Sequence, residues 1–138
     1  MRSLWKCRAG TGKSLTSIAI TGALWQADRI SRVLVVAPLS ILGVWSEEFC
    51  KFAAFDYDLR VLQGPPAKKR EALRKAPGTG LQVVVINYES AWRLEKELAA
   101  WNPDLIIADE GHKIKTHNIA AAKAMQRLGA RARYQLLL

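Results

Sequence analysis

Two glycines, a lysine and a serine near the start of the chain have the spacing of a phosphate-binding loop. The run CRAGTGKS covers residues 7–14 and comes directly before a stretch with helical periodicity. The glycines let backbone N–H groups approach phosphate oxygens, and the start of the helix adds the positive end of its dipole. The lysine adds a full charge, and the serine hydroxyl can ligate Mg²⁺. We therefore expect a nucleotide phosphate to be bound by Gly10, Thr11, Gly12, Lys13 and Ser14.

The first position of this loop departs from the strict G-x-x-x-x-G-K-[ST] pattern. Cys7 stands where that pattern has its first glycine, a position that nucleotide-binding helicases relax. The alternative interpretation is a glycine-rich turn that only caps a helix. An expected strand from Leu4 to Cys7, followed by a loop and a helix, favours phosphate binding.

A second set of chemical groups follows an apolar run late in the chain. Leu105 to Ala108 is followed by Asp109-Glu110-Gly111-His112, and open α/β sheets bind ligands at the carboxyl ends of their strands. Asp109 can hold Mg²⁺ opposite Ser14, usually through water, and Glu110 can orient the water that attacks the γ-phosphate. The alternative is that these carboxylates begin a solvated loop or cap a helix. The two histidines, His112 and His117, have no evident third ligand, so we do not predict a zinc site.

Short apolar runs predict the strands that must position these groups. The strongest are Val33 to Ala37, Leu81 to Ile86 and Leu105 to Ala108. Each is continuous rather than alternating, which is typical of parallel strands buried on both faces. Two further strands are expected from Asp58 to Leu62, nearer an edge, and from Tyr134 to Leu138.

Stretches with apolar residues three or four positions apart separate these runs and predict helices. We expect helices around Leu15 to Trp25, Leu42 to Phe49, Ala91 to Leu98 and Asn118 to Leu128. The alternation of strand and helix predicts an α/β fold with a mostly parallel sheet flanked by helices. The five tryptophans could stack on nucleic-acid bases, but Trp45 lies on an apolar stripe with Leu42 and Phe49, so core packing is the favoured interpretation and none of them is assigned to a site.

Composition narrows the class of protein. The chain has 138 residues, of which 50% are hydrophobic, and this predicts a single domain with a real core. No apolar run is long enough to span a bilayer, and the N-terminus has no signal-peptide pattern, so we expect an intracellular protein. The net charge of +9 favours phosphate-rich partners. A basic cluster around Lys68 and Lys69 is interpreted as a solvated helix face.

Several motifs occur in the order found in one family of ATPases. They are Gly-Thr-Gly-Lys-Ser, Ala37-Pro38-Leu39-Ser40 with Trp45 and Phe49 downstream, Asn87-Tyr88-Glu89, and DEGH followed by KIK. Together they resemble the first, N-terminal RecA-like lobe of a helicase-superfamily-two ATPase of the SWI/SNF-like branch. The resemblance covers nearly the whole chain and implies a RecA-like P-loop NTPase fold in a single lobe, residues 1–138. Gly111 stands where the family commonly has alanine.

The resemblance also implies a function. It implies ATP and Mg²⁺ as cofactors, duplex DNA bound without sequence preference, and a second RecA-like lobe as partners. By resemblance, Lys13 and Glu110 are catalytic, Asp109 and Ser14 hold the metal, and His112 has a coupling role. Nucleic-acid contacts are implied for Ser40, Tyr88, Lys113 and Lys115.

This interpretation makes the chain one half of a DNA-dependent ATPase motor. In the family the second lobe carries an arginine finger, so we expect the chain to be nearly inactive by itself. One alternative is a self-contained small P-loop kinase or NTPase, which would transfer phosphoryl groups without a second lobe. The other is a non-catalytic nucleic-acid-binding module that keeps the fold of a decayed ATPase, which would bind DNA but no nucleotide.

Overall fold

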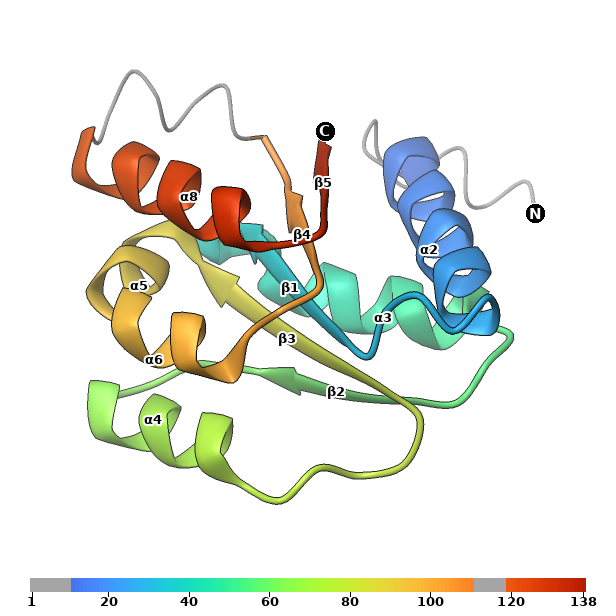
Figure 1. Ribbon diagram of the computed structural model, residues 1–138, viewed down its shortest axis with the longest axis horizontal. Helices are drawn as coiled ribbons and strands as arrows, with labels where there is room; N and C mark the ends of the chain where they lie inside the picture. Colours follow the sequence, from blue (N-terminus) through green and yellow to red (C-terminus); the bar gives the residue numbers. More distant parts are fainter. Residues whose placement is uncertain (1–10, 111–118) are drawn as a thin grey trace.

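Five parallel strands form the centre of the molecule in a computed structural model that describes residues 11–110 and 119–138 (Figure 1). Their order across the sheet is β2-β3-β1-β4-β5. The strands are β1 (Arg32–Ala37), β2 (Tyr57–Val61), β3 (Leu81–Asn87), β4 (Leu105–Ala108) and β5 (Tyr134–Leu137). All four neighbouring pairs are parallel, which confirms the expected α/β class. The position of β2 at the edge of the sheet is also as expected. The expected strand from Leu4 to Cys7 lies outside the described residues.

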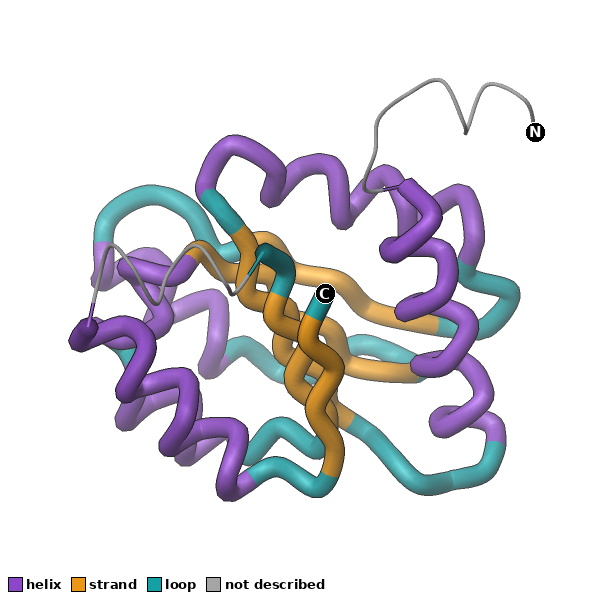
Figure 2. Tube along the Cα trace, turned by 90° about the horizontal axis from the view of Figure 1, so that it is seen from above, coloured by secondary structure: helices purple, strands orange, loops and turns teal. Residues whose placement is uncertain are grey.

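Helices cover both faces of this sheet, as Figure 2 shows from above. One face is covered by α2 (Thr11–Gln26) and α3 (Leu42–Phe52), with the short 3-10 helix η1 (Leu39–Ile41) leading into α3. The opposite face is covered by α4 (Pro66–Arg74), α5 (Tyr88–Arg93), α6 (Glu95–Trp101) and α8 (Ile119–Arg131). None of the helices within the described ranges is long and apolar enough to cross a membrane.

The two helical layers explain why the central strands are continuously apolar. In β1, Val33 and Val35 pack into the core beneath α2 and α3, while Leu34 and Val36 pack into the core on the other face. Successive side chains of a strand point to opposite faces, so a sheet covered on both sides needs an apolar residue at every position. All four of these residues have no exposed side-chain surface.

The helix expected from Ala91 to Leu98 is divided into α5 and α6. The break lies at Leu94, whose φ of −105° and ψ of 23° depart from helical values. Hydrogen bonds of helical spacing still cross the break, from the Leu94 N–H to the Ser90 carbonyl and from the Leu98 N–H to the Leu94 carbonyl, both at 2.9 Å.

Asp104 aligns β1 with β4 at the end of the sheet where these two strands begin. Its Oδ2 atom accepts the backbone N–H groups of Ser31 at 2.7 Å and Arg32 at 3.0 Å. The backbone N–H of Asp104 in turn donates to the carbonyl of Arg32 at 2.9 Å. These bonds join the start of β1 to the start of β4 and so help to place the residues at the far ends of both strands.

Candidate functional site

The carboxyl ends of three neighbouring strands meet at one edge of the sheet. Ala37 of β1 is paired with Asn87 of β3, and Val36 is paired with Ala108 of β4. The backbone N–H of Asp109 continues the ladder by donating to the Val36 carbonyl at 2.8 Å. The segments that follow these strands, which carry the three motifs after the phosphate loop, therefore begin side by side. The start of α2 lies at the same end of the molecule as the carboxyl ends of β4 and β5 (Figure 1).

Asp109 lies at the centre of this edge and is partly buried. The indole Nε1–H of Trp45 donates to its Oδ2 atom at 3.0 Å. Burial raises the pKa of the Asp109 carboxyl above its usual range, and the negative charge of Glu110 acts in the same direction. The Trp45 hydrogen bond and the positive charge of Lys13 oppose that rise in the pKa. A bound cation would favour the ionised carboxylate further.

The first turns of α2 carry the phosphate-loop residues that the structure describes. Thr11 and Gly12 begin this helix, Lys13 is exposed, and Ser14 is only 7% exposed. Lys13 lies close enough to Asp109 for its charge to influence the carboxyl pKa. That the phosphate-binding lysine and the metal-binding carboxylate belong to one site stays a prediction.

The residues present fit a magnesium nucleotide. A serine hydroxyl and a carboxylate are hard oxygen donors of the kind that Mg²⁺ prefers, and both belong to the same end of the fold. Within the described ranges no group of three or more His, Cys, Asp and Glu side chains could hold a metal by itself. Mg²⁺ is usually held by one or two protein groups together with substrate phosphates and water. Ser14 and Asp109 would hold the ion, and Lys13 would contact phosphate.

Glu110 occupies a sharp turn directly after β4. Its φ of 56° lies in the left-handed region, which is uncommon for a residue other than glycine. Asp109 has no such positive φ, so the two carboxylates differ in backbone conformation. The role of Glu110 in orienting water stays a prediction.

Tyr88 and Trp45 contribute to the site in ways that the sequence did not predict. The Tyr88 hydroxyl donates to the backbone carbonyl of Asp109 at 2.7 Å, and the side chain is 6% exposed. Burial raises the pKa of Tyr88 above its ordinary value, as do the charges of Asp109 and Glu110. The predicted nucleic-acid contact of Tyr88 stays a prediction, whereas its hydrogen bond to the Asp109 backbone carbonyl is observed.

Trp45 is a core residue, as expected, because its exposed fraction is 1%. Core packing is only part of its role, since a buried indole N–H usually finds a hydrogen-bond partner. From the sequence alone one could expect that a buried Trp45 would find a hydrogen-bond partner, but not that this partner would be Asp109.

The structure describes only some of the other predicted site residues. Ser40 lies in η1 and is exposed, next to Leu39, which is 66% exposed. The remaining predicted residues lie outside the described ranges and stay predictions; they are Gly10, His112, Lys113 and Lys115.

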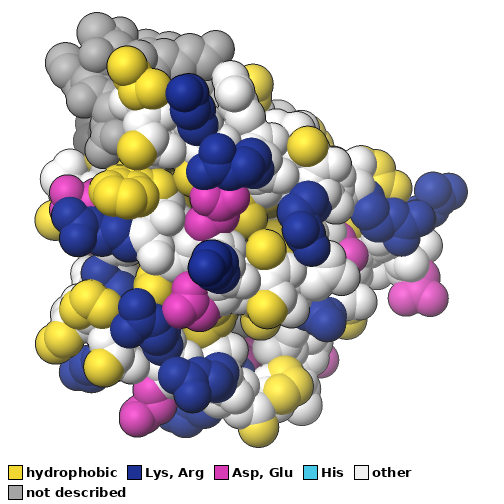
Figure 3. Space-filling view, turned by 60° about the vertical axis from the view of Figure 1, so that its left-hand side comes forward, with side chains coloured by type: hydrophobic (Ala, Val, Ile, Leu, Met, Phe, Trp, Pro, Cys, Tyr) yellow, Lys and Arg dark blue, Asp and Glu magenta, His cyan; other side chains and the backbone are white. Residues whose placement is uncertain are grey.

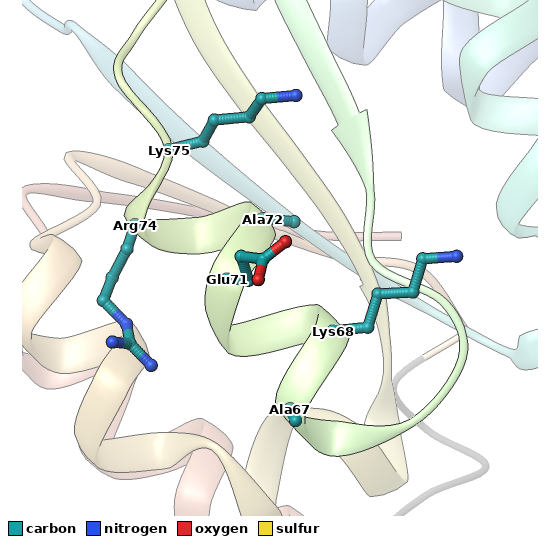
Figure 4. Close-up of a pocket in the computed structure, with 6 residues that line it drawn as sticks. All are labelled: Ala67, Lys68, Glu71, Ala72, Arg74 and Lys75. Carbon is teal, nitrogen blue, oxygen red and sulfur yellow. The ribbon is translucent and has the colours of Figure 1, made fainter.

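The basic cluster of α4 forms no comparable site. A hollow of about 670 Å³ is lined there by α4 and the residue after it; the side chains of Lys68 and Lys75 extend to one side of α4, whereas Arg74 points away from both (Figure 4). Basic and acidic groups alternate over this side of the molecule (Figure 3). Arg70, for example, is paired with Glu97 at 2.8 Å.

Known proteins are similar to this chain in sequence and in fold. The probable ATP-dependent DNA helicase CHR23 of Arabidopsis thaliana is 31% identical over 134 residues, which are 94% of this chain and 12% of that protein. The ISWI chromatin-remodeling complex ATPase ISW1 of Saccharomyces cerevisiae is 31% identical over 126 residues, which are 90% of this chain and 11% of that protein. The chain thus spans only about a tenth of the length of these curated relatives.

Solved structures are also similar to this chain in fold. The Sulfolobus solfataricus SWI2/SNF2 ATPase core in complex with dsDNA superposes with a TM-score of 0.70 at 26% identity, covering 94% of this chain and 25% of that chain. A nuclease-deletion mutant of the Type ISP restriction-modification enzyme LlaGI shares the fold with a TM-score of 0.69 at 18% identity, covering 93% of this chain and 14% of that chain. The profile of the SNF2-related domain matches residues 8–137, so the chain belongs to the SNF2-related domain family.

Proposed function

We propose that this chain is the ATP-binding, N-terminal RecA-like lobe of a DNA-dependent ATPase motor. The observation that carries the proposal is that Asp109 and the segments after β1 and β3 begin side by side at the carboxyl ends of three neighbouring strands, where open α/β sheets bind ligands. Family membership supports it, as do the names of two relatives, an ATP-dependent DNA helicase and a chromatin-remodeling ATPase. An intracellular location, where DNA is found, follows from this function.

Each site residue has a different role in the proposed hydrolysis of ATP. Lys13 binds phosphate oxygens, Ser14 and Asp109 hold Mg²⁺, and Glu110 orients the attacking water. The ion, when bound, neutralises charge that develops on the phosphates during transfer. Burial of Ser14 and the partial burial of Asp109 strengthen these interactions, because fewer water molecules compete for the same groups.

A calorimetric titration tests nucleotide binding at this place. The unaltered chain should bind a non-hydrolysable ATP analogue in the presence of Mg²⁺, and Lys13→Ala should bind it much more weakly. Lys51→Ala is the matched control, because it removes the same charge from an exposed position at the end of α3. Equal binding by the unaltered chain and Lys13→Ala would overturn the assignment.

Turnover by the isolated chain should be very slow. An arginine finger contributes about 10³–10⁵ in rate in related phosphoryl-transfer enzymes, and we propose that it comes from a second RecA-like lobe. Robust hydrolysis by the 138-residue chain, abolished in Lys13→Ala, would instead support a self-contained kinase or NTPase. DNA binding without any nucleotide binding would support a non-catalytic module.

DNA is the proposed second ligand. Ser40 is exposed just after β1, at the same edge of the sheet as Asp109, and Lys113 and Lys115 follow the acidic residues in the sequence. Such groups suit phosphates rather than base edges, so binding should be independent of sequence and sensitive to salt. The Sulfolobus solfataricus neighbour is a complex with dsDNA, which supports this choice of ligand.

Fluorescence anisotropy with a labelled duplex tests where the DNA binds. The double variant Lys113→Ala with Lys115→Ala should bind more weakly, and its salt dependence should fall by roughly one unit of slope for each phosphate that these lysines neutralise. Lys68→Ala with Lys69→Ala is the control of equal charge, and it should change affinity less. An equal decrease of affinity in the two double variants would show that net charge alone attracts the DNA.

A further inference from the structure

Asp109 is held by hydrogen bonds from two helices on opposite faces of the sheet. Trp45 of α3 donates to the side-chain Oδ2 atom at 3.0 Å, and Tyr88 of α5 donates to the backbone carbonyl at 2.7 Å. Trp45 belongs to the core cluster beneath α2 and α3, whereas Tyr88 belongs to the cluster on the other face. The same residue is therefore held at its side chain from one layer and at its main chain from the other.

Both donors are immobilised by packing. Trp45 is 1% exposed and lies against Phe49, with ring centroids 6.4 Å apart. Tyr88 is 6% exposed and packs in the same cluster as Ala91 and Leu94. Since neither ring can turn without disturbing a close-packed core, each donor has a fixed position and can hold its acceptor in one orientation.

We propose that Trp45 and Tyr88 are positioning residues that hold the Asp109 carboxylate in the orientation that receives Mg²⁺ with its nucleotide. This inference rests on the proposed function of the site. Groups that orient a metal-binding side chain without touching the metal change metal affinity about 10- to 100-fold when they are removed. Trp45 restrains the carboxylate itself, so it should have the larger effect of the two.

Trp92 offers a matched control for the removal of an indole. Its Nε1 atom is buried and has no hydrogen-bond partner within the described residues. Trp45→Phe and Trp92→Phe both replace an indole with a phenyl ring, but only the first removes a hydrogen bond to Asp109. Tyr88→Phe is a milder second variant, because it removes one hydroxyl and keeps the ring.

The test measures binding of a non-hydrolysable ATP analogue by calorimetry, in parallel with Mg²⁺ and with EDTA. The expected result is a decrease of about 10- to 100-fold in affinity for Trp45→Phe with Mg²⁺, and a smaller decrease for Tyr88→Phe. Affinity in EDTA should stay unchanged, and Trp92→Phe should match the unaltered chain in both conditions. A merely structural role would lower affinity equally with and without the metal.

Two contrary outcomes can be told apart. If the unaltered chain shows no Mg²⁺-dependent binding, the proposed function fails and this inference fails with it. If the unaltered chain binds and the gain in affinity from Mg²⁺ is the same in Trp45→Phe, Tyr88→Phe and Trp92→Phe, only the positioning role is overturned.

Discussion

Replacement of Gly80 by alanine should destabilise the fold more than the same change at Gly64. Both glycines have a left-handed backbone, with φ of 81° at Gly80 and 92° at Gly64. A Cβ atom at Gly80 would lie 2.3 Å from the backbone oxygen of Asp56, whereas at Gly64 its nearest neighbour would be the flexible Lys68 side chain at 3.5 Å. The Asp56 oxygen has little freedom to move, because it accepts the N–H of Leu81 at 3.0 Å where β3 begins.

The magnitudes follow from these two contributions. A side chain in left-handed backbone costs about 1–2 kcal/mol, and this cost applies to both variants. Overpacking adds about 1–3 kcal/mol at Gly80 alone. The free energy of unfolding should therefore fall by about 1–2 kcal/mol in Gly64→Ala and by about 2–5 kcal/mol in Gly80→Ala.

Urea unfolding followed by tryptophan fluorescence measures the difference. The midpoint should fall in both variants at an unchanged m value, and it should fall further in Gly80→Ala. Because Gly64 shares the backbone conformation, the difference between the variants isolates the contact with Asp56. An equal decrease in stability, or a larger one in Gly64→Ala, would refute the reasoning.

Three further predictions concern the sheet, a surface ion pair and the site. Asp104→Ala should lower the free energy of unfolding by about 1–3 kcal/mol in urea melts, because two backbone N–H groups are left without their acceptor, and Asp104→Asn should lower it less. The hydrogen bond from Arg127 is the main reason that the pKa of Glu95 is lowered. The stability that this pair contributes is therefore present above the ordinary pKa of 4.5 and is lost as the pH falls through the lowered value. Glu95→Gln should differ from the unaltered chain in urea melts at neutral pH but not in acid. In a protein with both lobes, Glu110→Gln should retain nucleotide in a binding assay and no longer turn it over, and a failure to bind would show that the two carboxylates have been assigned to the wrong roles.

Local patterns were enough to predict the α/β class and its mostly parallel sheet. Continuous apolar runs identified β1, β3 and β4, because a strand covered on both faces must be apolar at every position. The same reasoning placed Asp109 at the carboxyl end of a buried strand, and the structure confirms that it directly follows β4. These features depend on residues close to one another in the chain, which is why a sequence can reveal them.

Only the tertiary structure decided how the site is supported. Trp45 and Asp109 are 64 residues apart in the chain, and Tyr88 lies 21 residues from the carbonyl that it contacts. Their hydrogen bonds depend on how the layers that contain α3 and α5 pack against the sheet. Periodicity indicates that such side chains are buried, but the partner of a buried polar atom is determined by the three-dimensional packing of distant segments.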